Sequence, residues 1–141
     1  MDKRFWISAV VAFLIIFTVS WLVHGMLLHD EYAKLPQLFR PQPEISARFP
    51  YMVIAYLLLA FSFTWIYRQG ISVDRPWLIQ GFKFGLAAAL LAPAPMYLIY
   101  YVIQPMDGAT VIKQILGDGS MLIITGVAVA FINRSKAAIT T

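Results

Sequence analysis

Residues 5–28 read FWISAVVAFLIIFTVSWLVHGMLL, an apolar run interrupted only by two serines, one threonine, one histidine and one glycine. A bilayer core about 30 Å thick needs about 20 apolar residues in helical form, so this run is long enough to cross it. Three further runs, at 51–67, 81–103 and 111–132, are similarly apolar. We therefore predict an all-α integral membrane protein, a four-helix bundle in which residues 29–50 form the long outer loop.

The composition supports this fold class and excludes several functions. Hydrophobic residues make up 60% of the 141-residue chain and charged residues only 13%, far from the averages of soluble proteins. The spans leave too little chain for a soluble domain, so we expect residues 1–141 to form a single transmembrane domain. The chain has no cysteine, which excludes disulfides and thiolate metal sites. Its net charge of +4 is scattered at span ends, so we expect no nucleic-acid partner.

The first run differs from a secretory signal, although Lys3 and Arg4 precede it. It is longer than the apolar core of about 7–15 residues that a signal carries, and no small-x-small cleavage site follows it. We expect it to be a retained first span.

The basic residues predict the orientation. With four spans and the N-terminus inside, seven basic residues lie inside and four outside. The inner set is Lys3, Arg4, Arg68, Arg75, Lys83, Arg134 and Lys136, and the outer set is Lys34, Arg40, Arg48 and Lys113. We predict that both termini are cytoplasmic. Aromatic residues at span ends are expected to be interfacial anchors: Trp6, Trp65, Tyr67 and Trp77 inside, and Trp21, Tyr32, Tyr51, Tyr97, Tyr100 and Tyr101 outside.

Prolines shape the outer loop and the third span. Those at 36, 41 and 43 prevent one continuous loop helix, while Tyr32, Leu35 and Phe39 have the spacing of a short surface helix. Pro50 suits the first turn of the second span. Pro93 and Pro95 remove two backbone donors, so we predict a kink in the third helix.

Small residues form stripes on the third and fourth spans. The members are Gly81, Gly85, Ala88, Ala89 and Ala92 on the third, and Gly119, Gly126 and Ala130 on the fourth. Such stripes let two helix backbones approach closely. We expect a tight helix–helix seam, with a subunit interface as the alternative.

Asp118 is the strongest candidate for an intramembrane polar site. It lies within the predicted fourth span, where a carboxylate is costly unless it is paired, hydrated or neutralised. His24 is at a comparable depth in the first span with Ser20 one turn earlier, and Lys113 lies about one turn outward from Asp118. Three hypotheses remain open: Asp118 caps a helix start near the interface, forms a structural buried pair with His24, or belongs to a proton or ion relay.

No cofactor, metal site or catalytic residue is expected. His24 and His29 are five residues apart and do not share a helix face, and no second histidine within a span could complete a two-histidine haem site. Phosphate-loop, nucleotide-binding, nucleophile-elbow and zinc-protease motifs are absent from the sequence.

Two segments, WLVHGMLL at 21–28 and FTWIYRQG at 63–70, resemble those of small bacterial four-span membrane proteins of unknown function. The resemblance implies a multi-pass protein of the bacterial inner membrane and provides neither an activity nor a site residue.

The leading hypothesis from the sequence is a non-catalytic accessory or scaffold subunit. It would pack through its small-residue stripes against partner membrane proteins or a second copy, within the lipid bilayer. The alternative is a small transporter or an ion- or proton-conducting protein. Its polar site would comprise Asp118 and His24 with the kink at Pro93 and Pro95.

Overall fold

The computed structural model describes residues 2–134, and within that range every regular element is helical. Lys136, which was counted in the predicted orientation, lies outside the described residues. The elements in chain order are α1 (Lys3–Ser20), the π-helix η1 (Trp21–Leu27), α2 (His29–Ala33), the 3₁₀ turn η2 (Pro36–Leu38), α3 (Gln42–Gln69), α4 (Trp77–Leu91), α5 (Pro93–Ile103) and α6 (Gly108–Asn133).

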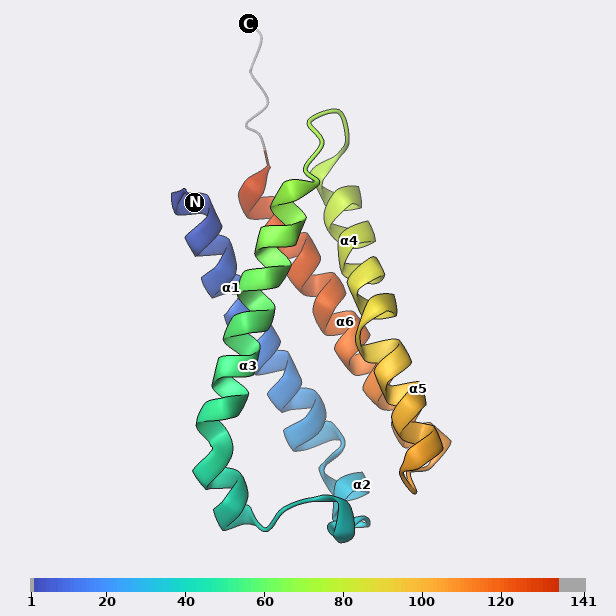
Figure 1. Cartoon of the computed structure of the whole chain (residues 1–141). Coiled ribbons are helices and arrows are strands. Elements are labelled where there is room, and N and C mark those ends of the chain that lie inside the picture. Colours follow the sequence, from blue (N-terminus) through green and yellow to red (C-terminus); the bar gives the residue numbers. More distant parts are fainter. Residues whose placement is uncertain (1, 135–141) are drawn as a thin grey trace, which may run out of the picture.

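Within the described residues, four helical segments are long and apolar enough to cross a membrane: Lys3–Leu27, Gln42–Gln69, Trp77–Ile103 and Gly108–Asn133. They run up and down, so that α2 lies at one end of the bundle and the 71–76 loop at the other, together with the start of α1 and the end of α6 (Figure 1). We call these the α2 end and the loop end. The all-helical, four-helix architecture expected from the apolar runs is therefore confirmed.

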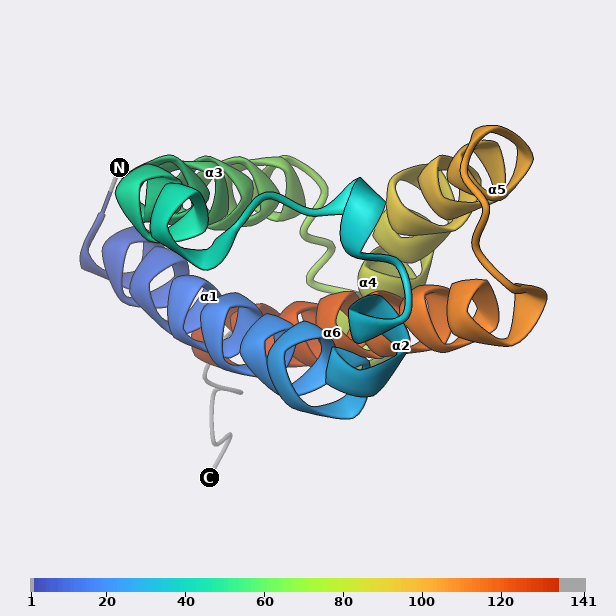
Figure 2. The same ribbon diagram turned by 90° about the horizontal axis from the view of Figure 1, so that it is seen from below.

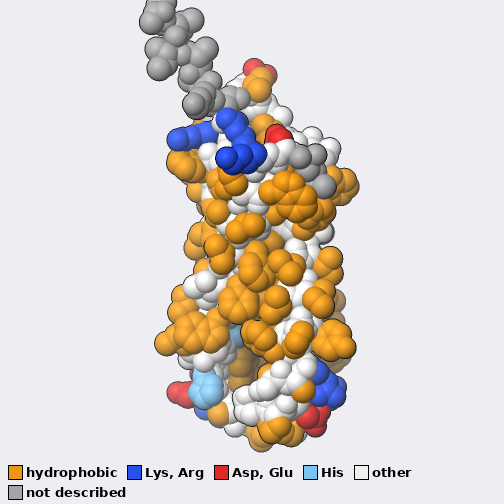
Figure 3. Space-filling view, turned by 90° about the vertical axis from the view of Figure 1, so that its left-hand side faces the viewer, with side chains coloured by type: hydrophobic (Ala, Val, Ile, Leu, Met, Phe, Trp, Pro, Cys, Tyr) orange, Lys and Arg blue, Asp and Glu red, His pale blue; other side chains and the backbone are white. Residues whose placement is uncertain are grey.

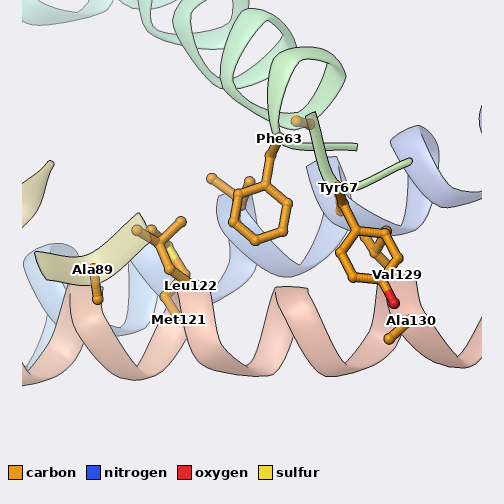
Figure 4. Packing of buried hydrophobic residues seen from close by; sticks show 10 residues of the cluster. Phe63, Tyr67, Ala89, Met121, Leu122, Val129 and Ala130 are labelled. Atoms are coloured by element: carbon orange, nitrogen blue, oxygen red, sulfur yellow. The ribbon is translucent and has the colours of Figure 1, made fainter. Parts of the chain in front are cut away.

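The two helices α1 and α6 pack against each other and support the other two (Figure 2). α3 packs on α1, while α4 and α5 pack on α6. The core lies where these helices meet. Phe63 and Tyr67 of α3 point toward Leu122 and Val129 of α6 (Figure 4), and all four side chains are buried.

The contact between α4 and α6 is made by the small-residue stripes. A Cβ atom built on Gly81 would lie 2.6 Å from the Cβ of Ala130, and one on Gly85 would lie 2.5 Å from the Cα of Ile123. A Cβ on Gly126 would collide with the Gly81 carbonyl oxygen. A Cβ on Gly119 would lie 3.6 Å from the Cβ of Ala89, an ordinary contact distance. We call this contact the α4–α6 seam.

The face of the molecule shown in Figure 3 is apolar in its middle and charged toward its ends. Hydrophobic side chains cover the centre of the face in Figure 3, and acidic, basic and histidine side chains gather toward the two ends. Side chains as large as Leu14, Leu58, Leu90 and Val102 are more than half exposed.

The second candidate span begins earlier than the sequence suggested. α3 starts at Gln42, so the helix extends through Pro50 and the connection is shorter than the predicted loop of residues 29–50. Pro43 occupies the first turn, the position expected for Pro50, and Pro50 lies inside the helix. The predicted surface helix is divided into α2 and η2. Apolar content locates a membrane-crossing segment but not the polar turns that continue its helix.

The third segment is interrupted at Ala92. α4 ends at Leu91 and α5 begins at Pro93, and Ala92 has φ −111° and ψ −77°. The N–H of Ala92 still bonds the Ala88 carbonyl, and Met96 bonds that of Ala92. The interruption therefore coincides with the two residues that carry no N–H, Pro93 and Pro95.

Candidate polar site at the α2 end

Five polar side chains from four elements form one hydrogen-bonded group. They are His24 of η1, Tyr32 of α2, Tyr97 of α5, and Gln114 and Asp118 of α6. We call this group the polar site.

His24 and Asp118 are in direct contact. Their Nε2 and Oδ1 atoms are 3.1 Å apart, and the side chains are 27% and 14% exposed. Both are therefore sheltered but reachable. Asp118 lies ten residues into α6, about 15 Å along the helix from its start.

The π-helix places His24. The N–H of Leu28 bonds the carbonyl of Val23, five residues earlier, at 2.9 Å. Such wide turns change which face the following side chains occupy and are frequent at functional sites. Gly117 lets η1 approach α6, because a Cβ there would lie 2.6 Å from Val23 Cγ1. No periodicity in the sequence predicts this π-helix.

Tyr97 holds the other oxygen of the Asp118 carboxylate. Its hydroxyl donates to Asp118 Oδ2 at 2.6 Å and lies 3.4 Å from His24 Nε2. Asp118 is thus bound on both oxygens, by one side chain from η1 and one from α5.

Tyr32 and Gln114 complete the group on the far side of the imidazole. The Tyr32 hydroxyl lies 2.6 Å from His24 Nδ1 and accepts from Gln114 Nε2 at 3.1 Å. The Tyr32 ring is parallel to the His24 ring, with centroids 6.0 Å apart. Burial raises the pKa of the Tyr32 hydroxyl, so this group stays protonated near neutral pH.

These contacts fit one proton arrangement without conflict. Tyr32 donates to Nδ1 of a neutral His24, whose Nε2–H donates to the Asp118 carboxylate. Gln114 is 3% exposed, and its Oε1 atom finds no hydrogen-bond partner within residues 2–134. The polar site therefore contains one buried acceptor that is unused in this arrangement.

Two residues predicted beside Asp118 and His24 have other partners. The Ser20 hydroxyl lies 2.6 Å from the Tyr56 hydroxyl of α3. Lys113 donates to Glu31 at 3.0 Å, and Glu31 also accepts from Lys34. Glu31 thereby ties α2 to α6 beside the polar site. These two cations lower the pKa of the Glu31 carboxyl, through their hydrogen bonds first.

The capping hypothesis for Asp118 is wrong. α6 runs without interruption through Gly117, Asp118 and Gly119, and its cap is Asp107. The Asp107 side chain accepts from the Thr110 N–H at 2.9 Å and from the Thr110 hydroxyl at 2.7 Å. A helix tolerates the two glycines here because α6 is packed against its neighbours on this side.

The sequence alone does not identify Tyr32, Tyr97 and Gln114 as members of the polar site. The sequence predicts that the two tyrosines are interfacial anchors, but both are only partly exposed and hydrogen-bond inward. Gln114 could have been found, because it precedes Asp118 by four residues and so shares its helix face.

Within residues 2–134, no three His, Asp or Glu side chains gather in an arrangement that could hold a metal ion. Comparison with protein-family models, curated proteins and solved structures found no match to this chain. The resemblance to small bacterial four-span proteins therefore stays a prediction.

Proposed function

We propose that the chain is an integral membrane protein that crosses a bacterial inner membrane four times, with both termini in the cytoplasm and the α2 end outside. Segments of 25–28 residues are about 37–42 Å long as helices, more than a hydrocarbon core of about 30 Å requires. The apolar middle of the surface supports insertion (Figure 3), and the excess of basic residues at the loop end supports the orientation.

We further propose that the protein is a small transporter or proton-conducting protein in which the polar site takes up the proton. The observation that carries this proposal is Asp118, an acid inside a membrane-crossing segment that is bound by His24 and Tyr97. Ionisable groups are costly at such positions and usually mark ion or proton pathways.

The polar site offers two hydrogen-bond patterns that differ by one proton. A proton added to His24 Nδ1 makes the imidazole a donor on both sides, so Tyr32 must accept from it and donate elsewhere. Turning the Gln114 amide by half a rotation would present its free Oε1 atom to Tyr32. The number of unpaired amide atoms is the same before and after this exchange.

The interruption at Ala92 suggests how the site could open. Tyr97 lies on α5, beyond the two prolines, so a kink there would move the Tyr97–Asp118 contact while α4 stays packed on α6. Broken helices of this kind line the binding sites of transporters.

The test is proton uptake by liposomes that contain the purified protein and a trapped pH-sensitive dye. When an electrical potential drives protons inward, we expect the lumen of vesicles with wild-type protein to acidify faster than the lumen of protein-free vesicles. Asp118→Asn should reduce the rate to the protein-free level. Asp30→Asn is the matched control, because it changes an exposed acid at the same end. A wild-type rate equal to the protein-free rate, or an unchanged rate in Asp118→Asn, would contradict the proposal.

The accessory-subunit hypothesis now depends on a different surface from the one predicted. Its predicted contact surface, the small-residue stripes, is occupied by the α4–α6 seam within the chain. A partner is now favoured by the exposure of two candidate spans. Only 17% of the most apolar stretch of α3 and 6% of that of α4–α5 are buried within the chain, against 33% in each of the other two. Extraction in mild detergent should then recover a partner or a homo-oligomer, and a monodisperse monomer would contradict it.

A further inference from the structure

A hollow lies between α3 and α4 at the loop end, far from the polar site. Its volume is about 460 Å³. The residues that line it are Ile66, Tyr67, Gln69, Gly70, Ser72, Arg75, Ile79, Gln80, Lys83 and Phe84. We call it the α3–α4 hollow.

Two cations border this hollow without an acidic partner. Arg75 and Lys83 are both exposed, and neither forms an ion pair within residues 2–134. The neighbouring Arg68 differs, because it forms a two-point ion pair with Asp2 at 2.6 and 2.8 Å. The α3–α4 hollow is therefore positively charged at its rim.

Lys83 is the more informative of the two cations. It lies six residues after Trp77, the first residue of α4, about 9 Å along the helix. At that position in a membrane-crossing helix, an ammonium group must reach the headgroup level or meet an anion.

The rim is held in shape by Gln80. Its Oε1 accepts from the Ser72 N–H, and its Nε2 donates to the carbonyls of Ser72 and Arg75, each at 2.8 Å. One side chain thus fixes the 72–75 loop to α4, and with it the backbone that carries Arg75. Toward the bundle axis the hollow is closed by Phe84, whose ring lies 4.7 Å from that of Phe63 and 5.3 Å from that of Tyr67.

The remaining walls are apolar. Ile66 of α3 and Ile79 of α4 are 52% and 48% exposed. A ligand complementary to this hollow has a negative charge that meets the cations at the rim and a hydrocarbon chain that packs along the helices. We propose that the α3–α4 hollow binds an anionic phospholipid, with its phosphate between Arg75 and Lys83 and one acyl chain against Ile66 and Ile79. Basic pockets between membrane helices are known to hold such headgroups.

This proposal rests on membrane insertion but not on the transport proposal, since it uses none of the residues of the polar site. The experiment is native mass spectrometry of the purified protein with equal amounts of phosphatidylglycerol and phosphatidylcholine of identical acyl chains. We expect wild-type protein to retain the anionic lipid preferentially. Arg75→Gln/Lys83→Gln should reduce that preference on the order of 10- to 30-fold.

The matched control is Lys3→Gln/Arg4→Gln, which removes the same charge at the same end but outside the hollow. It should keep the wild-type preference, and circular dichroism should show equal helicity in all three proteins. Inorganic phosphate at millimolar concentration should not displace the lipid, which separates a lipid site from a free-phosphate site. Equal retention of the two lipids, an unchanged preference in the Arg75/Lys83 variant, an equal loss in the control, or displacement by phosphate would each overturn the proposal.

Discussion

The two halves of α6 are used in different ways. Its second half forms most of the α4–α6 seam, and there Gly126 meets Gly81 and Gly85 with no room for a methyl group. Its first half carries Gln114 and Asp118 into the polar site, where contacts are hydrogen bonds and some exposure remains. Close packing stabilises one fold and tolerates little change, whereas a buried polar pair adds little net stability over apolar residues of the same size. The comparison separates the closely packed part of the helix from the part that contributes to the polar site.

The largest expected effect on stability comes from a substitution that breaks the α4–α6 seam. Gly126→Ala would place its Cβ against the Gly81 carbonyl and 3.0 Å from the Gly85 nitrogen, so the helices must move apart. We expect a loss of about 1–3 kcal/mol in unfolding free energy, measured by denaturant unfolding in detergent. Gly70→Ala is the control, because the nearest atom to its added Cβ lies 4.0 Å away. Equal stability of the two variants would show that the seam is looser than described.

The next effect tests whether the polar site is needed for folding. Asp118→Leu leaves the Nε2–H of His24 and the Tyr97 hydroxyl without their acceptor, at a cost of about 1–3 kcal/mol. Asp118→Leu/His24→Leu removes the imidazole as well and should be no less stable than the single variant. Intrinsic tryptophan fluorescence during unfolding measures both. A double variant much less stable than the single one would mean that the site is structural.

The difference between these regions also explains what the sequence could predict. The stripes that contain Gly81, Gly85 and Gly126 are visible as spacings of three, four and seven, because helix packing is periodic. The long apolar runs likewise predict four helices able to cross a membrane. Neither signal locates a helix end, which is why α3 begins at Gln42 rather than near Tyr51.

The polar site was only partly predictable for a physical reason. Asp118 stood out because a carboxylate is costly in an apolar run. Its similar depth to His24 only allowed a contact between the two side chains, as one of three open hypotheses. Tyr97 belongs to the polar site because α5 follows the break at Ala92, and Tyr32 belongs to it because α2 folds back toward η1. Those are tertiary features, and a tyrosine that anchors at an interface has the same local sequence as one that bonds a buried acid.

A smaller effect concerns the contact that holds α2 beside the polar site. Lys34 and Lys113 lower the pKa of Glu31 below its usual value of 4.5, so the ionised form is stabilised in the folded chain. The contribution is full above pH 4.5 and is lost as the pH falls through the lowered pKa. Amide hydrogen exchange of α2, corrected for the intrinsic pH dependence, should therefore show faster local opening in Glu31→Gln than in wild type at pH 7. This gap should narrow below pH 4.5. A gap that is independent of pH would assign the effect to something other than the charge.

The smallest effect concerns a polar group that lies in the core rather than in the site. Thr64 of α3 is fully buried, and its hydroxyl finds no hydrogen-bond partner within residues 2–134. Thr64→Val keeps the shape and removes the unpaired hydroxyl, so we expect equal or slightly higher stability, by up to about 1 kcal/mol. Thr125→Val is the contrasting variant, because the Thr125 hydroxyl donates to the Met121 carbonyl at 2.7 Å and its loss should not stabilise. If Thr64→Val instead lowers both stability and proton uptake, the hydroxyl is part of a polar path that continues from the polar site into the core. The division of the molecule into a packing region and a polar region would then no longer hold.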